Sequence, residues 1–159
     1  MRIRATILTL LAVFAALVLE HLPMPDLLSW LQPLWLLLLV SILVLHAPHF
    51  FGLWLAVPLG LFLDVENHQL LGLNVLTLGV HIVLLQLLYR RLIMFHFLQL
   101  TAVIILLVVL HQVLQFWAVA LISENRHPVA IWQPALVSGL VWPWLYGLFV
   151  IAIRRLNLT

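Results

Sequence analysis

The sequence predicts an all-α protein that crosses a membrane several times, and three observations support this fold class. Hydrophobic residues make up 66% of the 159 positions and charged residues only 8%, whereas roughly a quarter of a soluble domain is charged. Long unbroken apolar runs, such as LWLLLLVSILVL and TAVIILLVVL, are typical of membrane helices. A membrane β-barrel would instead show alternating segments of about ten residues.

Six apolar segments follow one another along the chain. A helix needs about twenty residues to cross a hydrocarbon core of about 30 Å. The predicted spans lie at 3–22, 27–45, 48–63, 70–89, 97–122 and 130–153. The breaks between them read HLPMPD, HAPH, DVENHQ, YRRLIMFH and SENRHP, all rich in proline, charge or other polar residues. We expect one six-span transmembrane domain over 1–159, without a separate soluble domain.

The third span is the shortest, since its apolar part at 50–63 has the length of a re-entrant segment. The distribution of charge favours a crossing. With six spans, one side of the membrane holds Arg2, Arg4, Arg90, Arg91, Arg154 and Arg155. The other side holds Arg126 and, at or near its membrane edge, all five acids. The positive-inside rule then predicts that both termini are cytoplasmic.

The ends and the composition exclude several other classes. Arg2 and Arg4 precede an apolar run that continues through Leu19, which favours an uncleaved anchor over a signal peptide. The chain has no cysteine, and therefore neither a disulfide framework nor thiolate chemistry. So few charges give no reason to expect a nucleic-acid partner.

Asp64, Glu66 and His68 occupy every second position of an otherwise apolar region. Such a group could bind a metal or move a proton, or it could be a solvated turn between two helices. On a helix, alternate residues diverge by about 200°, so the three side chains would not converge. The HExxH, GxSxG and P-loop patterns are absent. We therefore expect a turn, with no catalytic residue, metal or cofactor.

Asp64 also ends a stripe of small residues. Ala56, Gly60 and Asp64 are spaced by four and share one helix face. Small residues let membrane helices approach closely. Asp64 could then accept hydrogen bonds from the start of the fourth helix, where an anion is favoured. We expect this turn to orient two helices, and we expect Pro58 to kink the helix between Ala56 and Gly60.

The fourth and fifth spans each carry a polar stripe. The residues are Asn74, Thr77 and His81 in the fourth span and His111, Gln112 and Gln115 in the fifth. Counted from the outer ends of the spans, His81 and His111 lie at the same depth, which predicts that the two stripes face each other. Such residues either join helices or mark a pathway. We favour helix joining, because the only acid near a span interior is Glu20.

Pro143 lies inside the sixth span and predicts a kink that frees the carbonyl of Gly139. Gly139 and Gly147 flank this position. Two interpretations remain open: a simple bend, or a groove for the helix of a partner.

Several short motifs resemble the family of MreD, the rod shape-determining membrane protein of bacteria. They are PMPD at 23–26, QPLW at 32–35, AVPLGLFLD at 56–64, LLGLN at 70–74, which contains Gly72 and Asn74, and VWPWLYGL at 141–148. Their order and spacing, together with the length and the six-span plan, carry the resemblance. Ala56 departs from the family, which often has glycine there, but alanine still permits close helix approach.

The resemblance implies a non-enzymatic scaffold or adaptor of the bacterial inner membrane, acting in the machinery that elongates the cell wall and maintains rod shape. The implied partners are an MreC-like single-span periplasmic protein, a glycosyltransferase, a transpeptidase and an actin-like filament system, besides membrane lipids and a possible second copy of the chain. The implied fold is similar to the membrane substrate-binding subunits of vitamin transporters. The alternative function is therefore a small-molecule-binding subunit of a transporter.

The turn after the first span is the expected meeting place with the periplasmic partner. Pro23 and Pro25 fix the backbone of this turn, and Asp26 adds an acid to it. A stiff loop loses little entropy on binding. We expect the helix of the partner to pack on small residues of the third or sixth span.

Overall fold

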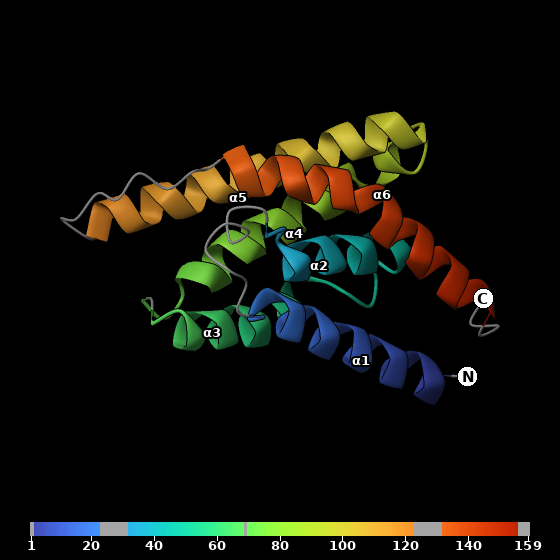
Figure 1. Ribbon diagram of the computed structural model, residues 1–159, viewed down its shortest axis with the longest axis horizontal. Coiled ribbons are helices and arrows are strands. Elements are labelled where there is room, and N and C mark those ends of the chain that lie inside the picture. The colour runs from blue at the N-terminus through green and yellow to red at the C-terminus, as the bar shows by residue number, and fades with distance from the viewer. Residues whose placement is uncertain (1, 23–31, 69, 123–131, 156–159) are drawn as a thin grey trace.

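The computed structural model describes residues 2–22, 32–68, 70–122 and 132–155. Within these ranges the chain forms six α-helices and no strand (Figure 1), which confirms the all-α prediction. The helices are α1 (Arg2–Glu20), α2 (Trp35–His46), α3 (Ala56–Glu66), α4 (Leu73–Leu92), α5 (Phe97–Ile122) and α6 (Trp132–Arg155). A short 3-10 helix, η2 (Leu53–Leu55), precedes α3.

Helix α2 lies at the centre of the bundle. It packs against α1, α4 and α6, and in Figure 1 it lies between α1 and α6. Every residue from 36 to 44 is buried. A helix that is hydrophobic on all sides has no solvent-facing stripe to expose, and such helices occupy the interior. The leucine-rich run that starts at Leu36 thus becomes the core around which the other helices are arranged.

The outer helices direct large apolar side chains away from the bundle. Phe14 on α1, Leu87 on α4, Leu98 and Leu121 on α5 and Trp144 on α6 are all more than 60% exposed. A soluble protein rarely shows so much apolar surface. A lipid bilayer covers such a surface, so the exposed side chains fit a membrane protein.

Among the residues that the structure describes, three helices, α4, α5 and α6, are long and apolar enough to cross a membrane. Helix α2 has 12 residues and α3 has 11, which correspond to lengths of about 18 and 16 Å. The six helices of the prediction are therefore present, whereas six complete spans stay a prediction.

Two predicted spans start too early. The span predicted at 27–45 becomes helical only at Trp35, because Pro33 disfavours helical geometry in the residue before it and removes a backbone donor. Gln32 and Leu34 are also non-helical, and 27–31 lies outside the described residues. The span predicted at 48–63 becomes α-helical only at Ala56, after turns and η2.

The two interior prolines differ in their effect. Pro58 lies in the first turn of α3, where a backbone N–H has no helical partner, so the predicted kink has no cause there. Pro143 lies well inside α6, which nevertheless continues to Arg155. In Figure 1, α6 changes direction about midway along its length, as expected for an interior proline.

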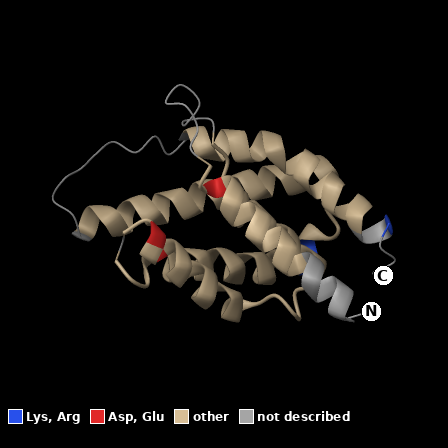
Figure 2. Cartoon of the chain, turned by 60° about the horizontal axis from the view of Figure 1, so that its bottom comes forward, with Lys and Arg blue, Asp and Glu red and all other residues tan. Residues whose placement is uncertain are grey.

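The acidic and the basic residues that the structure describes lie toward opposite ends of the bundle (Figure 2). Glu20 ends α1, and Asp64 and Glu66 lie at the end of α3; we call this end of the bundle the acidic end. Arg90 and Arg91 lie at the other end of the molecule, in the last turn of α4. The start of α1 and the end of α6 also lie at that end in Figure 1. This arrangement has the asymmetry that the sequence predicts across the membrane.

Candidate functional site

Helices α3 and α4 form an antiparallel pair joined along the small-residue stripe. A side chain at Gly79 would lie 3.9 Å from the Cβ of Ala56. One turn along α3, a Cβ at Gly60 would lie 2.5 Å from the Cα of Val75, so α3 rests directly on the backbone of α4. Moving four residues forward along α3, from Ala56 to Gly60, moves the contact four residues back along α4, from Gly79 to Val75. Close backbone approach is the role that small residues have between membrane helices.

The next step along the stripe brings Asp64 to the start of α4. Its Oδ2 accepts a hydrogen bond of 2.7 Å from the N–H of Gly72, and its Oδ1 accepts one of 2.8 Å from the N–H of Asn74. The side chain is fully buried. Its charge is stabilised by the unpaired N–H groups at the amino-terminal end of α4. Gly72 has a φ of +102°, which a residue with a Cβ rarely adopts.

Asp64, Glu66 and His68 do not converge. Asp64 faces α4, whereas Glu66 forms an ion pair of 2.9 Å with His21 after α1. His68 is exposed, with a positive φ of 51°. In the described part of the chain, no three histidine or acidic side chains are grouped so that they could hold a metal ion. Asp64 thus joins α3 to the start of α4, and Glu66 joins α3 to the end of α1, as two separate contacts.

Glu20 makes a second contact of the same kind. Its Oε2 accepts a hydrogen bond of 2.8 Å from the N–H of Leu36, in the first turn of α2. The amide of Gln32 donates to the backbone carbonyl of Glu20, and the hydroxyl of Ser138 on α6 accepts from the N–H of Leu34 at 3.0 Å. The acid at the end of α1 therefore caps α2 as Asp64 caps α4. We call these two contacts the acid caps.

The two polar stripes of α4 and α5 face each other. The Nε2 of Gln115 donates to the Oδ1 of Asn74 at 2.9 Å. One layer deeper, the rings of His81 and His111 meet edge to face at 5.9 Å between centroids. Both histidines are buried. The predicted pairing at equal depth is present as contacts, while any part of these residues in function stays a prediction.

Ser41 on α2 completes this buried group, although the sequence pattern does not predict its involvement. Its Oγ lies 2.8 Å from the carbonyl oxygen of Leu37 and also 2.8 Å from the Nε2 of His81. A hydroxyl has one proton, so the tautomer of His81 decides which of the two bonds that proton makes. A lone serine in an apolar run gave no signal in the sequence; its relation to His81 arises only from the packing of α2 on α4.

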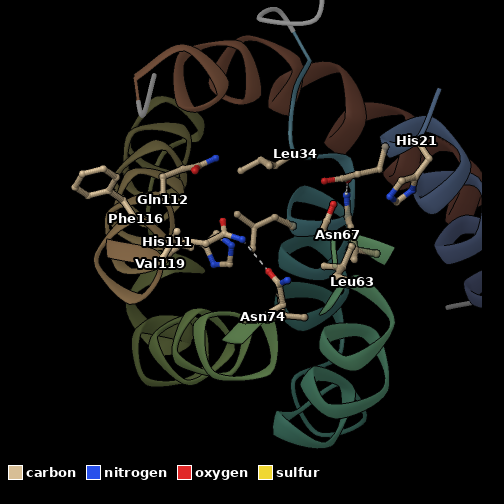
Figure 3. Close-up of a pocket in the computed structure, with 14 residues that line it drawn as sticks. His21, Leu34, Leu63, Asn67, Asn74, His111, Gln112, Phe116 and Val119 are labelled. Atoms are coloured by element: carbon tan, nitrogen blue, oxygen red, sulfur yellow. Dashed lines mark hydrogen bonds between the residues drawn. The ribbon is translucent and has the colours of Figure 1, made fainter. Parts of the chain in front are cut away.

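A cavity of about 420 Å³ lies beside this group, at the acidic end (Figure 3). Its wall comes from the ends of α1, α2, α3 and α4 and from the second half of α5. The side chains of His111 and Gln112 extend from α5 toward its interior, and Leu34 lies opposite them. Asn67, directly after α3, and Asn74, in the first turn of α4, add polar groups.

Comparison with known protein families matches residues 1–151 of the chain to rod shape-determining protein MreD. The chain belongs to the MreD family. A role in determining the rod shape of the cell follows from this membership, and its apolar helices fit a membrane protein. No solved structure matches this MreD-family chain, so the similarity to vitamin transporter subunits stays an implication of the resemblance.

The remaining predicted site residues have mixed outcomes. Pro23, Pro25 and Asp26 lie outside the described residues. Of the small residues expected to receive a partner, Gly60 rests on Val75 and a Cβ at Gly139 would overlap Ile105 of α5, whereas nothing lies within 4 Å of a Cβ at Gly147. A partner groove at Gly147 stays a prediction.

Proposed function

We propose that this MreD-family protein is a membrane scaffold that holds an MreC-like single-span partner within the machinery of cell-wall elongation. Membership of the family supports this proposal most directly. The two acid caps add a physical argument. Glu20 and Asp64 fix the starts of α2 and α4, so the acidic end is a preorganised surface. A preorganised surface loses little entropy when it binds.

The position of the acidic end decides which side of the membrane that surface faces. The positive-inside rule assigns the arginine-rich end to the cytoplasm and therefore the acidic end to the periplasm. A periplasmic domain of the partner would contact the acidic end, while the transmembrane helix of the partner packs within the bilayer. The glycosyltransferase, the transpeptidase and the actin-like filaments then belong to the same proposed assembly.

Helix α1 offers the surface for that partner helix. It packs mainly against α2. An apolar groove on α1 is lined by the exposed Leu10, Leu11 and Phe14 and by Val13 and Leu17, which also pack against the core. Gly60, the one glycine of α3, and Gly139, the buried glycine of α6, already contact neighbouring helices. A partner helix on α1 would replace lipid contacts without disturbing any packed pair in the bundle.

Co-purification with a tagged MreC-like protein tests this function. The unaltered chain should be recovered with the partner in a fixed ratio, and Phe14→Ala combined with Leu10→Ala should reduce the recovery severalfold. Leu87→Ala combined with Leu98→Ala is the matched control, because these side chains are equally apolar and exposed on α4 and α5. Equal recovery of both double variants would place the partner elsewhere, and no recovery of the unaltered chain would contradict the scaffold function.

The cavity at the acidic end supports the second candidate, a small-molecule-binding subunit of a transporter. Its volume of about 420 Å³ lies within the range of small-molecule sites. Purification in native lipids separates the two candidates. A stoichiometric single-span partner supports the scaffold, whereas a tightly retained small molecule without a partner supports the transporter subunit.

A further inference from the structure

The cavity at the acidic end has two chemically different walls. Leucine side chains from α2, α3 and α4 line one part, and polar side chains of α5, together with Asn67 and Asn74, line the other. His111 lies eleven residues before the end of α5, so the polar wall reaches about 16 Å inward from that end. Polar side chains at this depth are costly in a membrane unless they are satisfied, and they often mark a binding site.

We propose that this cavity binds a neutral, hydroxyl-rich group such as a sugar, supplied either as a lipid head group or as a free molecule. The proposal concerns a site that the scaffold function does not require, and it stands whether or not a partner binds α1.

Two side chains on α5 carry this inference. Gln112 is only 8% exposed and extends into the cavity, and no described residue forms a hydrogen bond with its amide. The Nδ1 of His111 is buried and also lacks a hydrogen-bond partner among the described residues. Buried polar groups in proteins are nearly always hydrogen-bonded. An amide offers two donors and an acceptor, and a hydroxyl group can bond to both kinds.

The charged residues among the described lining favour a neutral ligand over an ion. No arginine of the described residues lines the cavity, and an anion would lie near the carboxylate of Glu20 without an arginine countercharge from them. A cation would have Glu20 as its one acidic neighbour among the described lining residues, and one oxygen of this carboxylate already accepts the N–H of Leu36. His21, at the rim, is likewise engaged with Glu66. A neutral group with several hydroxyls satisfies Gln112 and His111 without adding charge.

Equilibrium binding to the full chain in lipid nanodiscs tests the ligand class. The probes are four radiolabelled molecules with the same tail, used below their micellar concentrations: octyl glucoside, octanol, octyl phosphate and octylamine. Free labelled glucose is the fifth probe, and binding to empty nanodiscs is subtracted. We expect saturable one-to-one binding of octyl glucoside only among the octyl probes. Glucose binding with equal affinity identifies a free sugar as the source, whereas binding of octyl glucoside without glucose identifies a lipid head group.

Gln112→Leu should weaken the binding of octyl glucoside about tenfold, as expected for loss of a neutral hydrogen bond in a buried site. Gln133→Leu is the matched control, because Gln133 is exposed on α6 and does not line the cavity. It should leave the affinity unchanged. If Gln112→Leu fails to fold, the comparison of the four octyl probes on the unaltered chain still decides the ligand class. Four results would overturn the proposal. The first two are saturable binding of octanol and stronger binding of octyl phosphate or octylamine than of octyl glucoside. The others are a lack of saturable binding by any probe and unchanged affinity of a folded Gln112→Leu variant for octyl glucoside.

Discussion

Asp64 accepts a hydrogen bond of 2.8 Å from the backbone N–H of Asn74, which joins the end of α3 to the first turn of α4. The same carboxylate also binds the N–H of Gly72. Since Glu20 caps α2 in the same way, the starts of α2 and α4 are each fixed by an acid at the end of the preceding helix. The two acid caps explain why acids are placed at this end in a chain with so few charges.

Replacement of Asp64 by Ala should destabilise the protein by about 2–4 kcal/mol, because two buried backbone donors lose charge-assisted bonds. The stability of Asp64→Asn should lie between that of the unaltered chain and that of Asp64→Ala, since an amide oxygen can retain one of the two bonds. Reversible unfolding in mixed detergent micelles, followed by tryptophan fluorescence, measures the change. Glu66→Ala is the control, because its half-exposed ion pair with His21 should contribute less than about 1 kcal/mol. Equal stability of Asp64→Ala and the unaltered chain would contradict the cap.

Gly60→Ala should destabilise the α3–α4 pair by about 1–3 kcal/mol, because the added Cβ meets the backbone of Val75, which cannot move independently. Gly147→Ala provides the comparison. No atom lies within 4 Å of a Cβ at Gly147, so that change should be neutral or should stabilise α6 by up to about 1 kcal/mol through helix propensity. The same unfolding assay checks both, and a Gly60→Ala variant as stable as Gly147→Ala would show that the helices do not approach so closely.

A double-mutant cycle on Asn74 and Gln115 measures the contact between the two polar stripes. We expect a coupling free energy of about 0.6–1.7 kcal/mol between Asn74→Ala and Gln115→Ala, the range measured for hydrogen bonds between membrane helices. Gln99→Ala replaces Gln115→Ala in the control cycle, because Gln99 lies at the opposite end of α5. Strict additivity in the first cycle would mean that the observed bond does not join α4 to α5.

Features of this structure that depend on residues close together in the sequence can be predicted from it, whereas features that depend on contacts between distant segments cannot. Helix α5 was predicted at 97–122 and occupies Phe97–Ile122, because a long apolar run between polar breaks defines both of its ends. The start of α3 was missed by eight residues, since hydropathy does not distinguish an apolar turn from an apolar helix. For the same reason the non-helical segment before Trp35 was included in a span.

The candidate site shows the same division. Spacing by four predicted the face shared by Ala56, Gly60 and Asp64, but the residues of α4 that meet this face could not be read from periodicity. The contact of Ser41 with His81 joins positions 40 residues apart. The residues around Ser41 in the sequence do not predict this contact, because the contact depends on the position of α2 in the centre of the bundle.

The orientation of the protein in the membrane can be measured with single cysteines, since the chain has none. Leu71→Cys lies at the acidic end and is exposed, and Arg90→Cys lies exposed near the other end. A membrane-impermeant thiol reagent applied to intact spheroplasts should label Leu71→Cys and leave Arg90→Cys unlabelled. Lysed spheroplasts, in which both should react, serve as the control. The reverse pattern would invert the assigned orientation.

Site-specific photocrosslinking tests the central claim, that a partner helix packs on α1 and its periplasmic domain contacts the acidic end. A photoreactive residue would replace Phe14 in the groove of α1, Leu22 beyond the end of α1, or Leu98 on α5, all exposed positions. In membranes that also contain the MreC-like protein, we predict strong crosslinks from positions 14 and 22 and none from position 98. Crosslinks from position 98 alone would contradict the account.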